Sequence, residues 1–342
     1  MLVILADDLT GALDTAAPFA ARGMHVEVAL STDAVGDALG EAPAVLSVNL
    51  ASRELGAQEA RRATLAALAG LPAGVRLFKK VDSRLKGHIA AELDAMAYRA
   101  ALVAPAIPAF GRIVADGCVT GFGVDVPISI AQQLGAHAGR ATIPDIASQS
   151  EMSLWLDRAE EAGIDLLIGA RGLAEAFAQR MSGGASARTA EIPAGPGLLV
   201  IGSRDPITLA QIDALRSEGG LRYLPAPNGR LAPVHADDSA LTLVQAVPGS
   251  ADATSEEVSH ALAESVCPQL TDAASTVLLS GGATAEAVLK KMGVARFRLL
   301  GECLPGLGLA HAQGRCIIAK SGGFGQPDTL REIASRLRHR TG

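Results

Sequence analysis

The sequence is poor in aromatic residues and has no excess of positive charge. Aromatic side chains make up 3% of its 342 residues, so a core must be built mostly from Ala, Leu and Val, which the 49% hydrophobic content supplies. The formal net charge is −6 and no long basic run occurs, so the Lys/Arg footprint that a nucleic-acid backbone needs is missing. We expect a compact globular protein with no nucleic-acid partner.

Cysteine and histidine patterns that hold metals are also missing. The cysteines are far apart and show none of the paired spacings of zinc or redox sites, which favours reduced thiols and a cytoplasmic location. The seven histidines are scattered, with no i, i+4 pair and no partnering cysteine. The sequence therefore predicts no metal held by protein ligands.

Long hydrophobic runs are absent as well. The apolar start LVILA, residues 2–6, lacks a preceding basic segment and meets aspartates after five residues. This is too short for a signal sequence or a membrane span, and no later apolar run reaches ~18 residues. We expect no membrane partner.

What the chain does contain is an alternation of strand-like and helix-like segments. Apolar strands are predicted at 2–6, 25–30 and 45–49, with an Ala-rich helix at 11–22 between the first two, and strand-helix alternation resumes after residue 197. The length, at ~150 residues per domain, predicts two domains, and the Gly/Pro-rich stretch 183–197 is the best linker candidate. The predicted fold class is α/β, with domains 1–195 and 196–342, each a mostly parallel sheet flanked by helices, and a cleft between them. Residues 106–150 are less regular and predict loops or a hairpin.

Polar residues gather where the strands of the first half end. Ligands of parallel sheets bind beyond the carboxyl ends of the strands, which makes such residues candidates for a site. Three of the six lysines fall at 79, 80 and 86, in a chain that otherwise prefers arginine. Helix capping by Asp8, Thr10 or Ser83, worth ~1 kcal/mol each, is the alternative explanation for those residues. The candidates of the first half are Asp7, Asp8, Arg53, Lys80, Asp82, Ser83, Arg84, Gly111 and Arg112.

Two glycine-rich turns and one Gly-Ser strand end occur in the second half. VLLSGGATAEAV (277–288) and AKSGGFG (319–325) each follow an apolar strand, and GSRDPIT (202–208) is a third polar strand end. Glycines allow close backbone approach and helix N-termini present free N–H groups, so these turns suit phosphates, although each could be a plain tight connection. The candidates here are Ser203, Gly281, Gly282, Ala283, Thr284, Lys320, Gly322 and Gly323.

Taken together, these motifs resemble the four-carbon acid sugar kinases, the family of D-threonate, D-erythronate and 3-oxo-tetronate kinases. The resemblance implies an N-terminal domain that binds the sugar acid and a C-terminal domain that binds ATP. The family's acidic residue in its Gly-Gly-Asp/Glu-Thr turn is Ala283 here, and its Asp-Ser-Thr-Leu-Arg-Gly reads Asp-Ser-Arg-Leu-Lys-Gly at 82–87. The matching stretches, in the family's order, are ADDLTGALDTA (6–16), FKKVDSRLKGHIAAEL (78–93), APAIPAFGR (104–112), GSRDPITLAQIDAL (202–215), SGGATAEAVLKKMG (280–293), PGLGL (305–309) and KSGGFG (320–325).

The implied reaction is ATP-dependent phosphorylation of the terminal hydroxyl of a small sugar acid of the threonate, erythronate or 3-oxo-tetronate type. Of Asp7 and Asp8, one would accept the hydroxyl proton and the other would bind sugar hydroxyls or magnesium, and the sequence leaves open which does which. Thr284, the glycine backbone and Lys320 would neutralise phosphates, with Mg²⁺ carried in by the nucleotide. The candidates for clamping the substrate carboxylate are Arg53, Lys80, Arg84 and Arg112.

Two other functions stay open at this point. An aldolase or dehydratase could use Lys80 as a Schiff-base nucleophile on a related sugar acid. A non-catalytic sensor could bind the sugar acid and nucleotide without turnover, which Ala283 makes conceivable. The sequence also leaves a homodimer open.

Overall fold

The structure is a computed structural model that describes residues 1–232 and 240–338. The chain forms two compact units, which divide between Arg188 and Thr189. We call residues 1–188 unit 1 and the residues from 189 onward unit 2. None of the helices in this described part combines the length and the apolar character that a membrane crossing requires.

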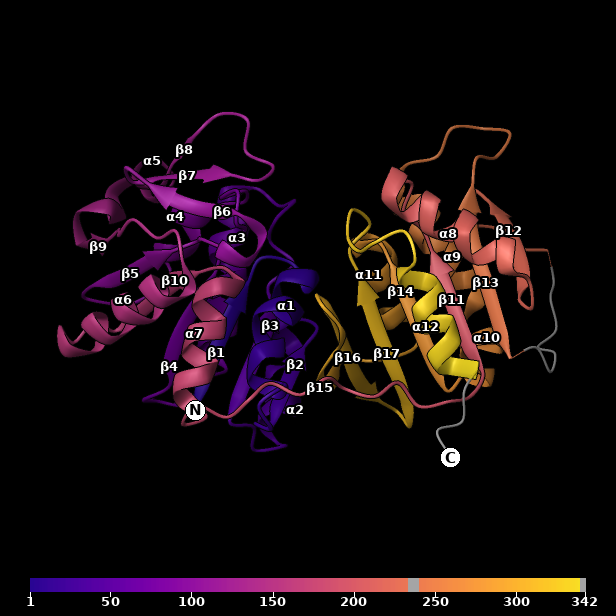
Figure 1. Cartoon of the computed structure of the whole chain (residues 1–342), viewed down its shortest axis with the longest axis horizontal. Coiled ribbons are helices and arrows are strands. Elements are labelled where there is room, and N and C mark those ends of the chain that lie inside the picture. The colour runs from indigo at the N-terminus through magenta and orange to yellow at the C-terminus, as the bar shows by residue number, and fades with distance from the viewer. Residues whose placement is uncertain (233–239, 339–342) are drawn as a thin grey trace. The chain divides into compact units, whose positions relative to one another are not determined.

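Unit 1 is built on a parallel sheet with the strand order β2-β3-β1-β4-β10-β5-β9 (Figure 1). Strands β1, β3 and β10 are buried along their whole length, as expected when helices cover both faces of a parallel sheet. The strands are β1 (Leu2–Ala6), β2 (Val26–Ala29), β3 (Val45–Asn49), β4 (Arg76–Lys80), β5 (Ala101–Ala104), β9 (Ala141–Thr142) and β10 (Leu166–Gly169).

The helices of unit 1 pack in groups, α1 against α7 and α7 against α6, and α3 against α4. Phe19 of α1 and Phe177 of α7 meet edge to face, with ring centroids 6.0 Å apart. Helix α6 was not predicted from the sequence. The helices are α1 (Leu9–Ala20), α2 (Val35–Leu39), α3 (Ala57–Ala69), α4 (Ile89–Leu93), α5 (Ile130–Leu134), α6 (Gln149–Glu161) and α7 (Arg171–Met181), with 3-10 turns at Thr32–Ala34, Pro108–Phe110 and Gly135–Arg140.

The irregular region 106–150 contains the hairpin that its turn residues predict. It forms a small antiparallel sheet of β6 (Arg112–Ala115), β7 (Cys118–Gly121) and β8 (Ile128–Ser129). Gly111, at φ 69°, and Gly121, at φ 91°, adopt the left-handed backbone that glycine allows. An added Cβ at Gly121 would lie 2.1 Å from the carbonyl oxygen of Gly111, so this hairpin requires glycine there.

Unit 2 has a sheet with the strand order β12-β13-β11-β14-β17-β16-β15. It is parallel from β12 to β17 and antiparallel from β17 through β16 to β15, so the expectation of a mostly parallel sheet is confirmed. Its strands are β11 (Gly197–Ile201), β12 (Arg222–Pro227), β13 (Leu241–Val247), β14 (Thr276–Ser280), β15 (Arg296–Leu304), β16 (Leu307–Ala312) and β17 (Arg315–Lys320).

The helices of unit 2 pack in two pairs, α9 against α11 and α8 against α12. Three of them begin with a side-chain cap or a glycine turn that the sequence signals: Thr254 caps α9, Asp205 caps α8, and Gly281 precedes α11. The helices are α8 (Pro206–Glu218), α9 (Ser255–Val266), α10 (Gln269–Ala273), α11 (Gly282–Lys291) and α12 (Thr329–Arg338).

The division between the units lies seven residues before the predicted boundary at 195, since unit 1 ends at Arg188. Residues 189–195 join unit 2 because Thr189 bridges to Glu302 and Ile192 is buried in the core around β11, β14 and β17. The Gly/Pro-rich composition indicated where the two units are connected. The burial of Ile192 shows that the connecting segment packs in the core of unit 2.

Strand register brings loops together at the carboxyl ends of both sheets. In unit 1, Ala6 pairs with Asn49 and Leu5 with Lys79, so the residues that follow β1, β3 and β4 meet. In unit 2, Ser280 pairs with Ile201 and with Lys320, so the loops after β11, β14 and β17 meet. Each sheet therefore gathers the predicted polar residues at one edge.

Candidate active site

Asp8 lies at the start of α1 and caps that helix. Its backbone is extended, and its Oδ1 accepts a hydrogen bond of 2.8 Å from the backbone N–H of Gly11. Its Oδ2 accepts a bond of 2.8 Å from the Thr10 hydroxyl. The capping explanation is therefore correct for Asp8. The cap uses Oδ1 of Asp8, and Oδ2 faces Arg53.

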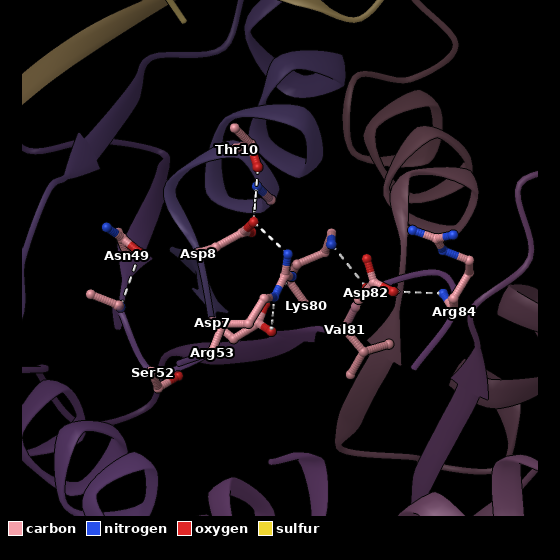
Figure 2. Close-up of polar contacts among 12 residues, drawn as sticks. Asp7, Asp8, Thr10, Asn49, Ser52, Arg53, Lys80, Val81, Asp82 and Arg84 are labelled. Carbon is pink, nitrogen blue, oxygen red and sulfur yellow. Dashed lines mark hydrogen bonds and ion pairs between the residues drawn. The ribbon is translucent and has the colours of Figure 1, made fainter. Parts of the chain in front are cut away.

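Arg53 joins the two aspartates. Its Nε and Nη2 donate to Oδ2 and Oδ1 of Asp7, both at 2.8 Å, and its Nη1 donates to Oδ2 of Asp8 at 2.6 Å (Figure 2). The contact with Asp7 is a two-point fork, the strongest geometry open to an arginine and a carboxylate. Arg53, which we expected to clamp a substrate carboxylate, donates to both aspartates in this structure.

The electrostatics of this triad differ between the two aspartates. Burial of Asp7, which is 2% exposed, acts to raise its pKa, but the hydrogen bonds from Arg53 and the charges of Lys79 and Lys80 outweigh that effect. The pKa of Asp7 therefore lies below its ordinary value. The side chain of Asp8 keeps 23% of its surface exposed. Asp7 is a buried carboxylate whose ionised form is favoured by Arg53, Lys79 and Lys80, and Asp8 is the carboxylate that solvent reaches.

The loop that carries Arg53 is held against Asp7 through its backbone. The N–H groups of Ser52 and Arg53 donate to the Asp7 carbonyl oxygen at 2.9 and 3.1 Å. The Asn49 side chain accepts from the N–H of Ala51 at 3.0 Å and stabilises the turn between them. Ala51 has a φ of 49°, in the left-handed region that a non-glycine residue rarely occupies.

Lys80 and Asp82 lie beside the triad at the end of β4. The Lys80 ammonium donates to the carbonyl oxygen of Val81 at 2.9 Å, and the residue is 5% exposed. Its Nζ lies 3.1 Å from the position that a Cβ on Gly11 would take, so glycine there makes room for the lysine. Asp82 accepts from the backbone N–H of Arg84 at 2.9 Å (Figure 2). Arg84 itself is exposed.

The structure brings Ser83 and Arg112 together from separate parts of unit 1. Nη1 of Arg112 donates to the Ser83 hydroxyl at 2.5 Å, while its Nε and Nη2 donate to the carbonyl oxygen of Phe122. Burial and then the nearby charge of Arg84 lower the pKa of Arg112. The capping explanation is wrong for Ser83, because the N-cap residue of the next helix is His88.

In unit 2 the loops after β11 and β14, together with the start of α9, enclose a pocket of about 270 Å³. Gly281, at φ 105°, turns the chain from β14 into α11, and Thr284 is 2% exposed. A Cβ on Gly202 would lie 1.9 Å from the Thr284 hydroxyl oxygen, so the loop after β11 can approach α11 only as glycine. The pocket is lined by Gly202, Ser203, Arg204, Ala253, Ser255, Val258, Ser259, Gly281, Gly282, Ala283 and Thr284.

Lys320 lies beside this pocket without lining it. Its ammonium is buried and donates to the Thr208 hydroxyl at 2.9 Å and to the carbonyl oxygens of Ser321 and Gly322 at 3.1 and 3.3 Å. Burial lowers the pKa of Lys320 to about 8, against the opposing charge of Asp205. The lysine thus holds the glycine turn after β17 rather than pointing at the pocket.

Gly322 and Gly323 pack against the start of the loop after β11. A Cβ on Gly322 would lie 2.1 Å from the Ser203 hydroxyl oxygen, and one on Gly323 would lie 3.1 Å from an Asp205 carboxylate oxygen. Gln211 on α8 donates through Nε2 to the carbonyl oxygens of Phe324 and Gln326 and holds the far end of the same turn.

Sequence reasoning missed the polar residues of α8 that support this turn. Thr208 and Gln211 are fully buried, and they lie on the same face of α8 as the buried Ile212 and Leu215. Their signal is a polar residue at a helical position that should face the core, which requires the helix register to be known first.

Comparisons with known proteins agree with the geometry. Residues 2–132 match the model of a sugar-binding N-terminal domain, and residues 231–330 that of a nucleotide-binding C-terminal domain. The chain is 30% identical to a D-threonate kinase of Cupriavidus necator, over 96% of both chains. It is 26% identical to a 3-oxo-tetronate kinase of the same species, over 98% of this chain and 97% of that one. A solved structure of a Haemophilus influenzae protein, 18% identical, shares the fold with a TM-score of 0.73, over 98% of this chain and 100% of that one. The chain belongs to the four-carbon acid sugar kinase family.

Proposed function

We propose that the protein is an ATP-dependent kinase that phosphorylates the terminal hydroxyl of a four-carbon sugar acid. Unit 1 would hold the sugar acid and unit 2 the nucleotide, in line with the matches to sugar-binding and nucleotide-binding domain models. The observation that carries the proposal is the triad of Asp7, Arg53 and Asp8, which presents one solvent-accessible carboxylate on a rigid, charge-balanced support.

In this proposal Asp8 is the general base and Asp7 its anchor. The acceptor hydroxyl donates its hydrogen bond to the exposed carboxylate of Asp8. Its proton would move there as the hydroxyl oxygen bonds to the γ-phosphorus of ATP and the bond from that phosphorus to the bridging oxygen breaks, which releases ADP. Both aspartates accept hydrogen bonds on both oxygens, but Asp7 suits this role less because it is 2% exposed, whereas the Asp8 side chain keeps 23% of its surface exposed. Arg53 holds the orientation of the Asp8 carboxylate before the proton arrives.

We assign the substrate carboxylate to Arg84 and Arg112. The two guanidinium groups are near enough for the charge of Arg84 to lower the pKa of Arg112, and the charge of Asp82 offsets this repulsion only in part. A bound carboxylate would remove that repulsion and accept the N–H donors that both arginines still offer. Ser83, already bonded to Arg112, would fix the orientation of that side chain.

The pocket of unit 2 fits a nucleotide by the chemistry of its donors. Hydroxyls, glycine backbone, the N-terminus of α11 and Arg204 line it, and these groups suit phosphate oxygens. When bound there, ATP supplies the phosphoryl group. Since no lining side chain is a carboxylate, the proposal has Mg²⁺ enter on the phosphates of the nucleotide. Ser203 and Thr284 would orient those phosphates through their hydroxyls.

An ADP-release assay tests the proposal. The purified protein is mixed with ATP, Mg²⁺ and D-threonate, D-erythronate or 3-oxo-tetronate in turn, and ADP is measured by a coupled enzyme reaction. We expect ADP only when one of these acids is present, together with a phosphorylated acid detected by mass spectrometry. Equal ADP with and without every acid would refute the proposal, as would a borohydride-trapped adduct on Lys80, which would indicate Schiff-base chemistry.

A further inference from the structure

A buried polar network lies beneath the triad and is not used by the mechanism above. The Lys79 ammonium pairs with Oε2 of Glu92 at 2.9 Å, and the two side chains are 0% and 2% exposed. Oε1 of the same Glu92 accepts a bond of 2.6 Å from the Ser52 hydroxyl. The network therefore connects β4, α4 and the loop after β3.

This network contacts both the strand that leads to the aspartates and the loop that carries Arg53. Lys79 also donates to the carbonyl oxygen of Leu5, two residues before Asp7, at 3.3 Å. Ser52, at the other end, precedes Arg53 directly and donates its N–H to the Asp7 carbonyl oxygen. Glu92 thus fastens the loop that carries Arg53 to the strand that carries the aspartates.

A buried ion pair is a weak source of fold stability, because desolvation offsets most of the attraction between the charges. Its geometric effect is larger. Glu92 has one oxygen on a cation of β4 and the other on the Arg53 loop, so the loop cannot shift without breaking a buried, charge-assisted bond. The adjacent Ala51, in its left-handed conformation, shows that the loop is held in a shape it would not adopt freely.

We propose that Glu92, with Lys79 and Ser52, is a positioning residue of the kinase: it sets the place of Arg53 and, through Arg53, the orientation of the Asp8 carboxylate. The inference rests on the proposed function for its catalytic consequence. Its structural part, the dependence of the Arg53 contact on Ser52 and Glu92, stands apart from any activity.

The test compares Ser52→Ala with Ser47→Ala. Ser47 is equally buried in the same unit, and its hydroxyl donates to the carbonyl oxygen of Ala12 at 2.9 Å, so both variants remove one buried hydroxyl bond. We expect both variants to lose stability, Ser52→Ala the more because its hydroxyl binds a buried carboxylate. Only Ser52→Ala should lose kcat, by ~10-fold or more, because small displacements of a catalytic carboxylate slow the reaction steeply. The KM for ATP should not change, because the pocket of unit 2 is untouched.

A second variant separates positioning from stability. Lys79→Met combined with Glu92→Leu replaces the pair by apolar side chains, an exchange that folds well in other proteins. Its melting temperature should lie closer to that of the wild type than the melting temperature of Ser52→Ala does. Its kcat should nevertheless fall below that of the wild type, as in Ser52→Ala. Full kcat in both Ser52→Ala and the double variant, or an equal loss in Ser47→Ala, would overturn the inference.

The pKa of Asp7, followed by carbon NMR of its carboxyl group, gives a readout without catalysis. If Ser52→Ala loosens Arg53, the pKa of Asp7 rises in that variant and stays unchanged in Ser47→Ala. An unchanged pKa of Asp7 in both variants would overturn the inference even if no sugar acid were phosphorylated. If the wild type phosphorylates no sugar acid but Ser52→Ala still raises the pKa of Asp7, the network is supported while the proposed function fails.

Discussion

Replacing Lys320 by methionine should change how the stability of the protein depends on pH. The ammonium of this lysine is 1% exposed, and its hydrogen bonds go to a hydroxyl and two carbonyl oxygens. These neutral oxygens only partly replace the water that a charged group loses on burial. For this reason the folded protein binds the proton of Lys320 less tightly than the unfolded chain does.

The expected size follows from the two pKa values. Burial lowers the pKa of Lys320 from 10.5 to about 8, and each pH unit between these values is worth about 1.4 kcal/mol of unfolding free energy. Below pH 8 both states bind the proton and the penalty is fully present. Between pH 8 and 10.5 only the unfolded chain binds it, so stability rises with pH. The rise totals about 3 kcal/mol at most and ends above pH 10.5.

Urea unfolding followed by circular dichroism, at pH 7 to 10.5, measures this effect as a difference between wild type and Lys320→Met. The other titrating groups are common to both proteins, so their contributions cancel in that difference. Lys290→Met is the matched control, because Lys290 is an exposed lysine of the same unit. From pH 7 to 10.5 the unfolding free energy of the wild type should rise by about 3 kcal/mol relative to that of Lys320→Met. Relative to Lys290→Met it should not rise. A difference for Lys320→Met that stays constant to within about 1 kcal/mol would refute the idea of an unpaired buried charge.

The remaining predictions concern the two sites. Asp8→Asn should keep the helix cap, since Asn caps as well as Asp, and lower kcat by ~100-fold or more in the ADP-release assay; full activity would exclude Asp8 as the base. Gly282→Val should fold normally, because among the described residues no heavy atom lies within 4 Å of a Cβ there, yet bind ATP at least ~10-fold more weakly in calorimetry by filling the pocket. Gly202→Ala should instead lower the melting temperature, because its Cβ would collide with Thr284; an unchanged melting temperature would contradict the close approach of the loop after β11 to α11. Arg112→Lys should raise the KM for the sugar acid ~10-fold without affecting that for ATP, and equal changes in both would exclude the carboxylate assignment.

The sequence predicted most of what depends on local pattern. Apolar runs ending in polar residues identified β1, β3 and β14 closely, because a buried parallel strand must be apolar throughout and must end where a loop reaches water. The same ends supplied Asp7, Asp8 and Arg53. Helix α6 was missed because its apolar residues are sparse: among its thirteen residues, only Met152, Leu156 and Ala159 are buried.

The partners within each site could not be predicted, because they depend on how separate loops meet. Arg53 was expected to bind substrate, and only the register of β1 with β3 shows that it reaches Asp7 first. Lys320 was expected to face phosphate, and only the packing of α8 shows that Thr208 takes its ammonium. The sequence does carry a signal for Glu92, because this residue lies between Ile89 and Leu93 on a helix face that should be apolar.

The left-handed backbone of Ala51 affects how ordered the loop that carries Arg53 is before a ligand binds. An L-residue gives up roughly 1 kcal/mol to adopt that conformation, a cost that glycine avoids. A glycine at this position would also add freedom to the loop, whereas alanine restricts the alternatives open to it. The chain thus exchanges a small part of its folding free energy for a guanidinium whose place is settled before any ligand arrives, and less ordering entropy remains to be lost on binding.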